Sequence, residues 1–149
     1  MIFRRLLHLY FLLTRALTLG VRAAIRTPDG KFILVRHTYT PGWHFPGGGV
    51  EKGEIAIEAL RREVSQEVAI DLRDQPSLLG VYYNRQVSRR DHVLLYLCAY
   101  NGALPTHVAN AEIECFDTFG LEDLPADIDP GTERRIREIV LAEAQGGEW

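Results

Sequence analysis

Residues 48–70 read GGVEKGEIAIEALRREVSQEVAI, and this stretch decides the fold that we predict for the chain. Its second half carries apolar residues three and four positions apart, which is the spacing of one helix face. These residues are Ala56, Ile57, Leu60, Val64 and Val68. The pattern predicts an amphipathic helix over residues 54–68.

Three polar side chains share another face of this expected helix. Because a helix turns by about 100° per residue, Glu63, Gln66 and Glu67 project together beside the apolar stripe. Like charges at this spacing destabilise an isolated helix, and a hard divalent cation with oxygen ligands would compensate for that cost. The alternative is a solvated acidic face that Arg61 and Arg62 balance.

The segment before the helix has the composition of a loop with special backbone geometry. Residues 40–49 include Pro41, Pro46 and the glycine run 47–49. Glycine lets a backbone approach a ligand closely and reach positive φ, and a helix start favours anions through its amide groups and dipole. A phosphate-tolerant loop beside a carboxylate face indicates phosphoryl chemistry, in which Mg²⁺ binds a few carboxylates together with substrate phosphates.

Loop and helix together resemble the signature of the Nudix hydrolase family. That signature is glycine, five residues, glutamate, seven residues, arginine–glutamate, an aliphatic residue, any residue, two glutamates, any residue, glycine and an aliphatic residue. The matching positions here are Gly48, Glu54, Arg62, Glu63, Val64, Glu67 and Ile70. Gln66 stands where the family has glutamate, and Ala69 stands where it has glycine.

The resemblance implies a metal site and a reaction. Glu63 and Glu67 would be catalytic, and together with Gln66 and the carbonyl of Gly47 they would hold Mg²⁺ or Mn²⁺. The family cleaves a nucleoside diphosphate linked to another group. Water attacks phosphorus, and a carboxylate assists the removal of its proton.

The resemblance also implies supporting groups and a base. Arg62 and Glu54 would form an internal salt bridge that orients the helix. The base in such proteins often lies before a late strand, where Glu112 is our candidate and Glu114 is its rival. A solvated loop residue is the alternative for each of the two.

Five residues are candidate substrate contacts: Gly48, Gly49, Arg62, Trp43 and His37. An aromatic ring beside the glycine loop would stack on a base or sugar, and core packing is the alternative for Trp43. For His37, phosphate contact competes with the ordinary role of a histidine whose hydrogen bonds are satisfied at a strand end.

The two departures from the signature keep a second function open. Gln66 retains an oxygen ligand but loses a negative charge, which would weaken the site for a hard cation. Ala69 replaces a glycine that commonly ends the helix in left-handed geometry, where alanine has a steric cost. The alternative to an active pyrophosphohydrolase is therefore a Nudix-fold nucleotide-binding module with weakened catalysis.

The rest of the chain is rich in strands. Apolar and β-branched runs predict strands over residues 21–27, 31–37, 78–83, 92–100 and 116–119, and a turn at 28–30 makes the first two a hairpin. A closing helix is expected over residues 132–144, with Thr132 as N-cap and Gly146 as its stop. We expect an α+β fold, a Nudix-like α/β/α sandwich with a mixed β-sheet between helices, in a single domain over 1–149.

Composition narrows the class of partner. The 149 residues carry a formal charge of −3, which argues against sequence-independent binding to long nucleic acid but allows a small nucleotide-type substrate. Cys98 and Cys115 lack the spacing of a zinc site or a disulfide framework, so we expect a reduced, cytoplasmic protein.

Residues 1–18 form an apolar extension in which Arg4 and Arg5 precede the apolar run 6–13. The run is too short to span a bilayer, and no small-residue cleavage site follows it. We expect a docking helix or a leading strand of the domain rather than a signal peptide, and no membrane partner. Two alternatives stay open: a homodimer surface, and a membrane-associated protein anchored by residues 1–13.

Overall fold

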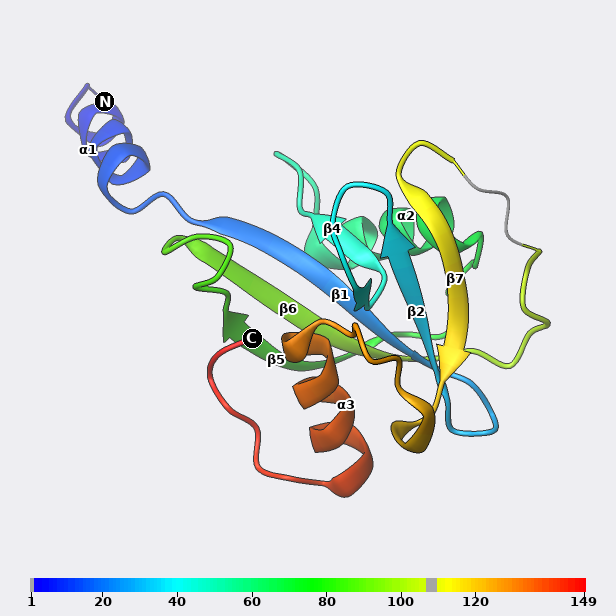
Figure 1. Ribbon diagram of the computed structural model, residues 1–149. Coiled ribbons are helices and arrows are strands. Elements are labelled where there is room, and N and C mark those ends of the chain that lie inside the picture. The colour runs from blue at the N-terminus through cyan, green and yellow to red at the C-terminus, as the bar shows by residue number, and fades with distance from the viewer. Residues whose placement is uncertain (1, 107–109) are drawn as a thin grey trace.

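The computed structural model describes residues 2–106 and 110–149 and contains one seven-stranded sheet with helices around it (Figure 1). Its elements, in chain order, are α1 (Ile2–Thr14), β1 (Thr18–Arg26), β2 (Phe32–His37), β3 (Trp43–His44), β4 (Gly47–Gly49), α2 (Ala56–Val68), β5 (Ser77–Tyr83), β6 (Asp91–Ala99), β7 (Ile113–Phe119), the 3₁₀ turn η1 (Leu121–Asp123) and α3 (Pro130–Leu141). The strand order is β3-β2-β1-β6-β5, with β4 beside β1 and β7 beside β2. Only the β1–β6 pair is parallel among the described strands, so the sheet is mixed.

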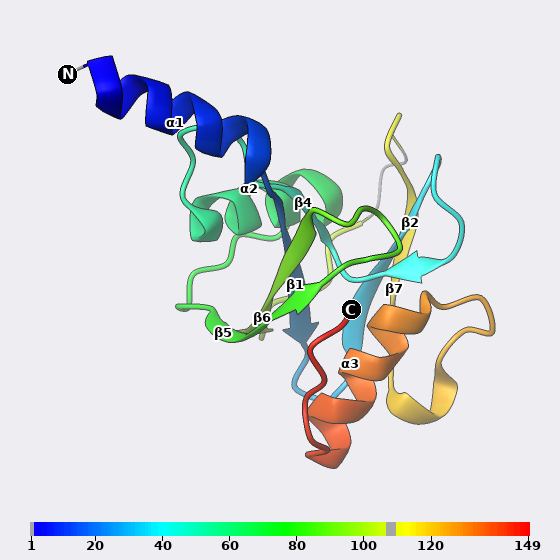
Figure 2. The ribbon, with the colours of Figure 1, turned by 90° about the vertical axis from the view of Figure 1, so that its left-hand side faces the viewer.

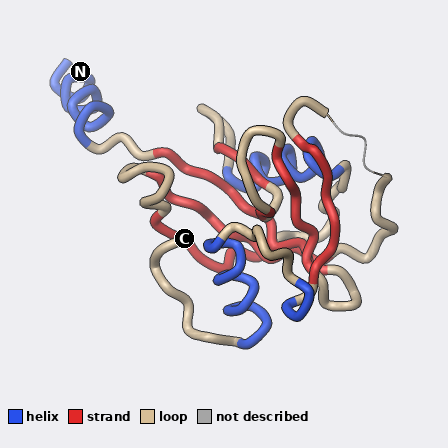
Figure 3. Tube along the Cα trace, in the orientation of Figure 1, coloured by secondary structure: helices blue, strands red, loops and turns tan. Residues whose placement is uncertain are grey.

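The sheet lies between α2 on one face and α3 on the other (Figure 3). Strand β1 shows how the sequence supports both layers. Val21 and Ile25 are buried in the cluster that contains Leu60 of α2, whereas Ala24 is buried in the cluster that contains Ile136 of α3. Since neighbouring residues of a strand point to opposite faces, β1 is apolar on both sides. The predicted α+β class, with a mixed sheet between helices, is confirmed.

Strands β1 and β2 pair over a shorter stretch than the predicted hairpin. They are antiparallel neighbours, but the register pairs only Arg26 with Phe32 beside the turn. The main partner of β1 is β6, in parallel, from the pair Thr18–Asp91 to the pair Arg26–Ala99. The predicted loop over residues 40–49 also contains two short strands, and Gly47–Gly49 pairs with β1. Strand pairing therefore holds the glycine run in place.

The cap predicted for the last helix is wrong. Asp129, not Thr132, caps α3: its carboxylate accepts a hydrogen bond of 2.8 Å from the Thr132 amide, and Pro130 begins the helix. The stop is also earlier than Gly146, because Ala142 takes the left-handed conformation that ends α3. Both expectations fail for a local reason: aspartate and threonine are both good caps, and sequence alone does not decide between neighbours.

The chain after α3 turns back onto the sheet. The Trp149 amide donates to the Tyr83 carbonyl at 3.0 Å, and a Cβ at Gly131 would lie 2.3 Å from the Trp149 ring. Arg135, only 2% exposed, donates to the Glu148 carbonyl and to the Glu138 carboxylate, both at 2.7 Å. Helix α3 and the tail are thus fixed as one unit.

The N-terminal extension is a helix rather than a leading strand. Figures 1 and 2 show α1 standing away from the sheet, joined to β1 by a short segment. None of its residues is buried. Within residues 2–106 and 110–149, no helix is both long and apolar enough to cross a membrane.

Candidate active site

The site is built where the glycine strand β4 meets helix α2. A Cβ on Gly47, whose φ is +148°, would lie 2.0 Å from the Val21 carbonyl oxygen of β1. A Cβ on Gly48 would lie 2.5 Å from a carboxylate oxygen of Glu63. These two positions therefore admit glycine alone without displacing a strand or a carboxylate.

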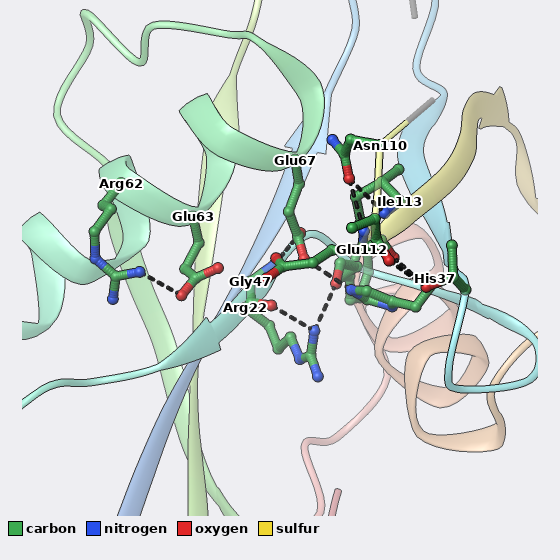
Figure 4. Close-up of polar contacts among 12 residues, drawn as sticks. Arg22, His37, Gly47, Arg62, Glu63, Glu67, Asn110, Glu112 and Ile113 are labelled. Carbon is green, nitrogen blue, oxygen red and sulfur yellow. Dashed lines mark hydrogen bonds and ion pairs between the residues drawn. The ribbon is translucent and has the colours of Figure 1, made fainter. Parts of the chain in front are cut away.

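Glu67 joins three elements in the interior (Figure 4). Its side chain is buried, its Oε1 lies 2.7 Å from Nε2 of His37 on β2, and its Oε2 accepts a 2.8 Å hydrogen bond from the Gly47 amide. Both oxygens thus have a partner, which compensates a buried carboxylate for its lost hydration. The arrangement holds this carboxylate beside the glycine strand.

Glu63 lies one turn earlier on α2 and is less well compensated. Its Oε1 accepts a 2.6 Å hydrogen bond from Nη1 of Arg62. Burial raises the pKa of Glu63, and the charge of Glu67 adds to that rise against the opposing effect of Arg62. Two carboxylates in one half-buried place favour an added cation.

Arg62 ties the helix to the loop before it. Its Nε and Nη2 donate to the two oxygens of Glu54 at 2.8 and 3.0 Å, and Nη2 also donates to the Gly49 carbonyl at 3.1 Å. The hydrogen bonds from Arg62 hold the pKa of Glu54 at about 2, well below its usual value. The ion pair that the family resemblance implied is present, and it holds Arg62 against Glu63 as well.

The remaining predicted ligand and base residues are exposed. Gln66 lies on the solvent side of α2, next to the buried Glu67. Glu112 precedes β7, where its carbonyl accepts a hydrogen bond from the Thr38 amide at 2.9 Å, and Glu114 lies at the start of β7. In Figure 4, Glu112 stands on the side of the site where Glu67 and His37 meet.

Tyr39, which the sequence analysis did not select, lies beside His37, with the two ring centroids 5.4 Å apart. Burial raises the pKa of its hydroxyl, and the charges of Glu67, Glu112 and Glu63 add to that rise. The hydroxyl thus lies within electrostatic reach of carboxylates from α2 and from the segment before β7. No feature of the sequence around Tyr39 indicated this position.

Arg22 is a second residue that sequence reasoning missed. From β1 its Nη1 donates to the carbonyls of Phe45 and Gly47, at 3.1 and 3.0 Å. The register pairs Arg22 with Gly47 directly, so the guanidinium lies against the same carbonyl that was expected to bind metal. The only available signal was a charged residue in the middle of a strand, between the apolar residues Val21 and Ala23.

The two expected substrate contacts outside the signature, Trp43 and His37, both make contacts within the protein. Trp43 is half-buried, its ring packs edge-on against Phe119 at a centroid distance of 4.9 Å, and the Arg36 guanidinium lies over it. His37 is buried and faces Glu67. The Trp43 contacts are those of core packing and the His37 contact satisfies a ring nitrogen, while contact of either residue with substrate stays a prediction.

A preformed cage of charged ligands is absent from the described part of the chain. Within residues 2–106 and 110–149, no three His, Cys, Asp or Glu side chains group closely enough to hold a metal ion. What the site offers instead is Glu63 and Glu67 beside backbone carbonyls. That donor set suits Mg²⁺, which commonly binds through one or two carboxylates and completes its shell with water and substrate phosphates.

Comparison with known proteins gives a match over most of the chain. A family model described as NUDIX domain matches residues 16–139. An ADP-ribose pyrophosphatase of Methanocaldococcus jannaschii is 33% identical over 105 residues, which are 66% of this chain and 62% of that protein. An RNA pyrophosphohydrolase of Halorhodospira halophila is 38% identical over 55 residues, 37% of this chain and 30% of that protein. The chain thus spans less than two thirds of either relative.

Solved structures agree with the arrangement of the sheet and helices. A MutT NUDIX hydrolase from Burkholderia pseudomallei has a TM-score of 0.70 at 27% identity, covering 82% of this chain and 97% of that one. An ADP-ribose pyrophosphatase from Streptococcus suis has a TM-score of 0.69 at 23% identity, covering 88% of this chain and 96% of that one. The second likeness concerns the fold alone.

Proposed function

The chain belongs to the NUDIX domain family, and on this basis we propose that it is a metal-dependent pyrophosphohydrolase. Its reaction would be the cleavage of a pyrophosphate bond in a nucleoside diphosphate derivative by attack of water on phosphorus. One observation carries the proposal: Glu67 is fixed between His37 and the Gly47 amide, and Glu63 lies in the same half-buried place.

The residues around Glu67 fit a divalent cation. Glu63 and Glu67 would be its charged ligands, and the Gly47 carbonyl and the exposed Gln66 amide would be neutral ones. When bound, Mg²⁺ or Mn²⁺ would neutralise negative charge that develops on the phosphate oxygens. The Gly47 carbonyl accepts a hydrogen bond from Arg22, and since a carbonyl oxygen has two lone pairs it would bind such an ion as well.

The other residues would position the reacting groups. Gly48 and Gly49 would let a phosphate approach the backbone, because no side chain stands in the way. Arg62 would keep Glu63 in place through its hydrogen bond. Any direct contact of Arg62 with substrate would have to leave its ion pair with Glu54 intact. Glu112 would accept the proton of the attacking water, with Glu114 as the rival base.

The relatives' names guide the choice of substrates to test. They name ADP-ribose in one case and RNA in another, and each name describes hydrolysis of a pyrophosphate linkage. The chain's charge of −3 favours the smaller of these. We therefore propose a small nucleotide-type substrate.

A substrate panel with paired variants tests the function. Release of phosphate or nucleoside monophosphate would be measured from ADP-ribose, sugar nucleotides, dinucleoside polyphosphates and nucleoside triphosphates, with Mg²⁺ and with Mn²⁺. Glu67→Gln should lower kcat/KM on the best substrate by about 10²–10³-fold, since a metal contributes several kcal/mol. Glu58→Gln, on an exposed position of the same helix, is the matched control and should leave it unchanged. Equal activity of the two variants, or none on the whole panel, would rule the proposal out.

A second function is favoured by the departures at Gln66 and Ala69. A Nudix-fold module that binds nucleotides without turning them over would give calorimetric binding but no metal-dependent release. Gln66→Glu adds a carboxylate beside Glu67 on an exposed position that can accept it. Activity that appears only in this variant would support the binding module over the enzyme.

The thiols are compatible with the reducing, cytoplasmic setting that we propose. Cys98 and Cys115 are both free, and burial raises the pKa of Cys98 to about 12. A thiol with so high a pKa is not a nucleophile at neutral pH.

A homodimer also stays a proposal, to be tested by sedimentation.

A further inference from the structure

Helix α1 exposes its whole apolar surface. Phe3 is 79% exposed and Leu13 is 69% exposed, and no residue of the helix is buried. In Figures 1 and 2 the helix projects beyond the end of β1, away from both layers of the sandwich. Contiguous apolar surface of this kind marks an interaction site in a soluble domain.

Most apolar residues of α1 lie on a different side from its basic residues. The apolar side, read at helical spacing, comprises Ile2, Phe3, Leu6, Leu7, Leu9, Tyr10 and Leu13. Arg4 and His8 lie on the other side together with Phe11 and Leu12, and Arg5 borders them. Arg15, the first residue after α1, lies over the Phe11 ring on that same side. The apolar side takes up about half of the circumference, wider than the narrow seam that a single partner helix covers.

The positive charge of the N-terminal extension indicates the kind of surface to which α1 would bind. Residues 1–28 contain no Asp or Glu, and the first acidic residue is Asp29. With Arg4, Arg5 and Arg15 on the extension, the rest of the chain keeps 14 of the 17 Lys and Arg against all 20 Asp and Glu. A basic amphipathic helix on an otherwise acidic protein is attracted to anionic surfaces, while the body is repelled by them.

We propose that α1 is an interfacial anchor, which lies in the headgroup layer of a membrane that contains anionic phospholipid. Its apolar side would enter the boundary of the acyl chains, and its arginines would face the lipid phosphates. At about 1.5 Å per residue, a helix of this length is shorter than the roughly 30 Å hydrocarbon core, so it lies on the membrane and does not span it. The proposal replaces the sequence-based expectation of no membrane partner.

The short length of α1 also supports a membrane partner. An isolated helix of fewer than about 12–15 residues is marginal in water, and α1 has 13 residues without tertiary packing. Burial of its apolar side at a membrane would supply the packing that the protein body does not. Since α1 leads through Arg15 and Leu17 into β1, the anchor is tied to the strand that pairs with Gly47 and Gly48.

Vesicle flotation of the full chain tests the anchor. Phosphatidylcholine vesicles would be compared with vesicles in which a third of the lipid is phosphatidylglycerol, without any addition at the N-terminus. We expect binding to the anionic vesicles that weakens at high salt, a helical signal in circular dichroism that increases with them, and about 100-fold weaker binding to neutral ones, from roughly fivefold per arginine.

Paired leucine variants separate the apolar side from the basic one. Leu6→Gln changes the apolar side, whereas Leu12→Gln makes the same change four residues after His8, on the basic side. Leu6→Gln should reduce binding clearly more than Leu12→Gln, and Arg4→Gln should lose about fivefold on anionic vesicles alone. Equal binding to both lipids, or equal loss in the two leucine variants, would overturn the anchor. Self-association in the absence of lipid that Leu6→Gln abolishes would also overturn it, in favour of a second copy of this chain.

Discussion

Helices α1 and α2 have the same length, 13 residues, and both are amphipathic, yet the protein body uses only one of them. Helix α2 buries Ala59, Leu60, Val64 and Val68 against the sheet, whereas α1 buries nothing. The comparison teaches that amphipathic spacing predicts a helix but not the surface that covers it. The surface depends on whether the rest of the chain offers a complementary apolar face.

The charges of the two helices differ in the same way. On α2, Arg62 is paired with Glu54 and with Glu63. Among the described residues, no salt bridge involves α1, and Arg15, just after the helix, lies over the ring of Phe11. The charges of α2 are therefore engaged inside the domain and shape its site, whereas those of α1 take part in the membrane contact that we propose.

The largest expected effect contrasts one leucine from each helix. Leu60→Ala should lower the free energy of unfolding by about 2–5 kcal/mol, because Leu60 is fully buried. Leu9→Ala should change it by less than about 0.5 kcal/mol, because Leu9 is exposed. Urea denaturation measures both. A comparable loss in the two variants would mean that α1 packs on the body in solution.

A smaller effect concerns the ion pair at the start of α2. Since the pKa of Glu54 is held at about 2, below its usual 4.5, the carboxylate stabilises the fold above that usual value and loses this contribution as the pH falls toward 2. Glu54→Gln should therefore destabilise the protein at pH 7, with the difference from wild type closing in acid. Arg4→Gln on α1 is the control and should show no such dependence. Thermal unfolding across pH 3–7 measures it, and a constant difference would exclude the ion pair as the cause.

The smallest effect lies at the helix ends. Ala69 has φ +55° and Ala142 has φ +52°, so α2 and α3 both end on a left-handed alanine. Glycine lacks the steric cost of that conformation, and Ala69→Gly should stabilise the protein by about 0.5–1 kcal/mol. Ala142→Gly is the matched variant and should behave alike. Destabilisation at position 69 alone would show that its methyl group has a packing role.

The sequence was informative where the signal is local. Helical spacing located α2 and placed Glu63 and Glu67 on one face, and the pairing of Arg62 with Glu54 followed from the family signature. Non-local pairing was not readable. The contact of His37 with Glu67 depends on the packing of α2 against the sheet, and that of Arg22 with Gly47 depends on the pairing of β1 with β4. Periodicity within a segment carries no information about its neighbour in the sheet.

The close approach of Gly48 to Glu63 has a consequence for how this gene can vary. Every amino-acid substitution at a glycine adds a side chain, and at position 48 even a methyl group would meet the Glu63 carboxylate at 2.5 Å. Each small mutational step there disturbs the fold, whereas Gly49, with nothing within 4 Å of an added Cβ, has room within the fold for such steps. Of these two adjacent, chemically identical residues, Gly48 should therefore be constrained by folding and Gly49 only by the phosphate contact that we propose for it.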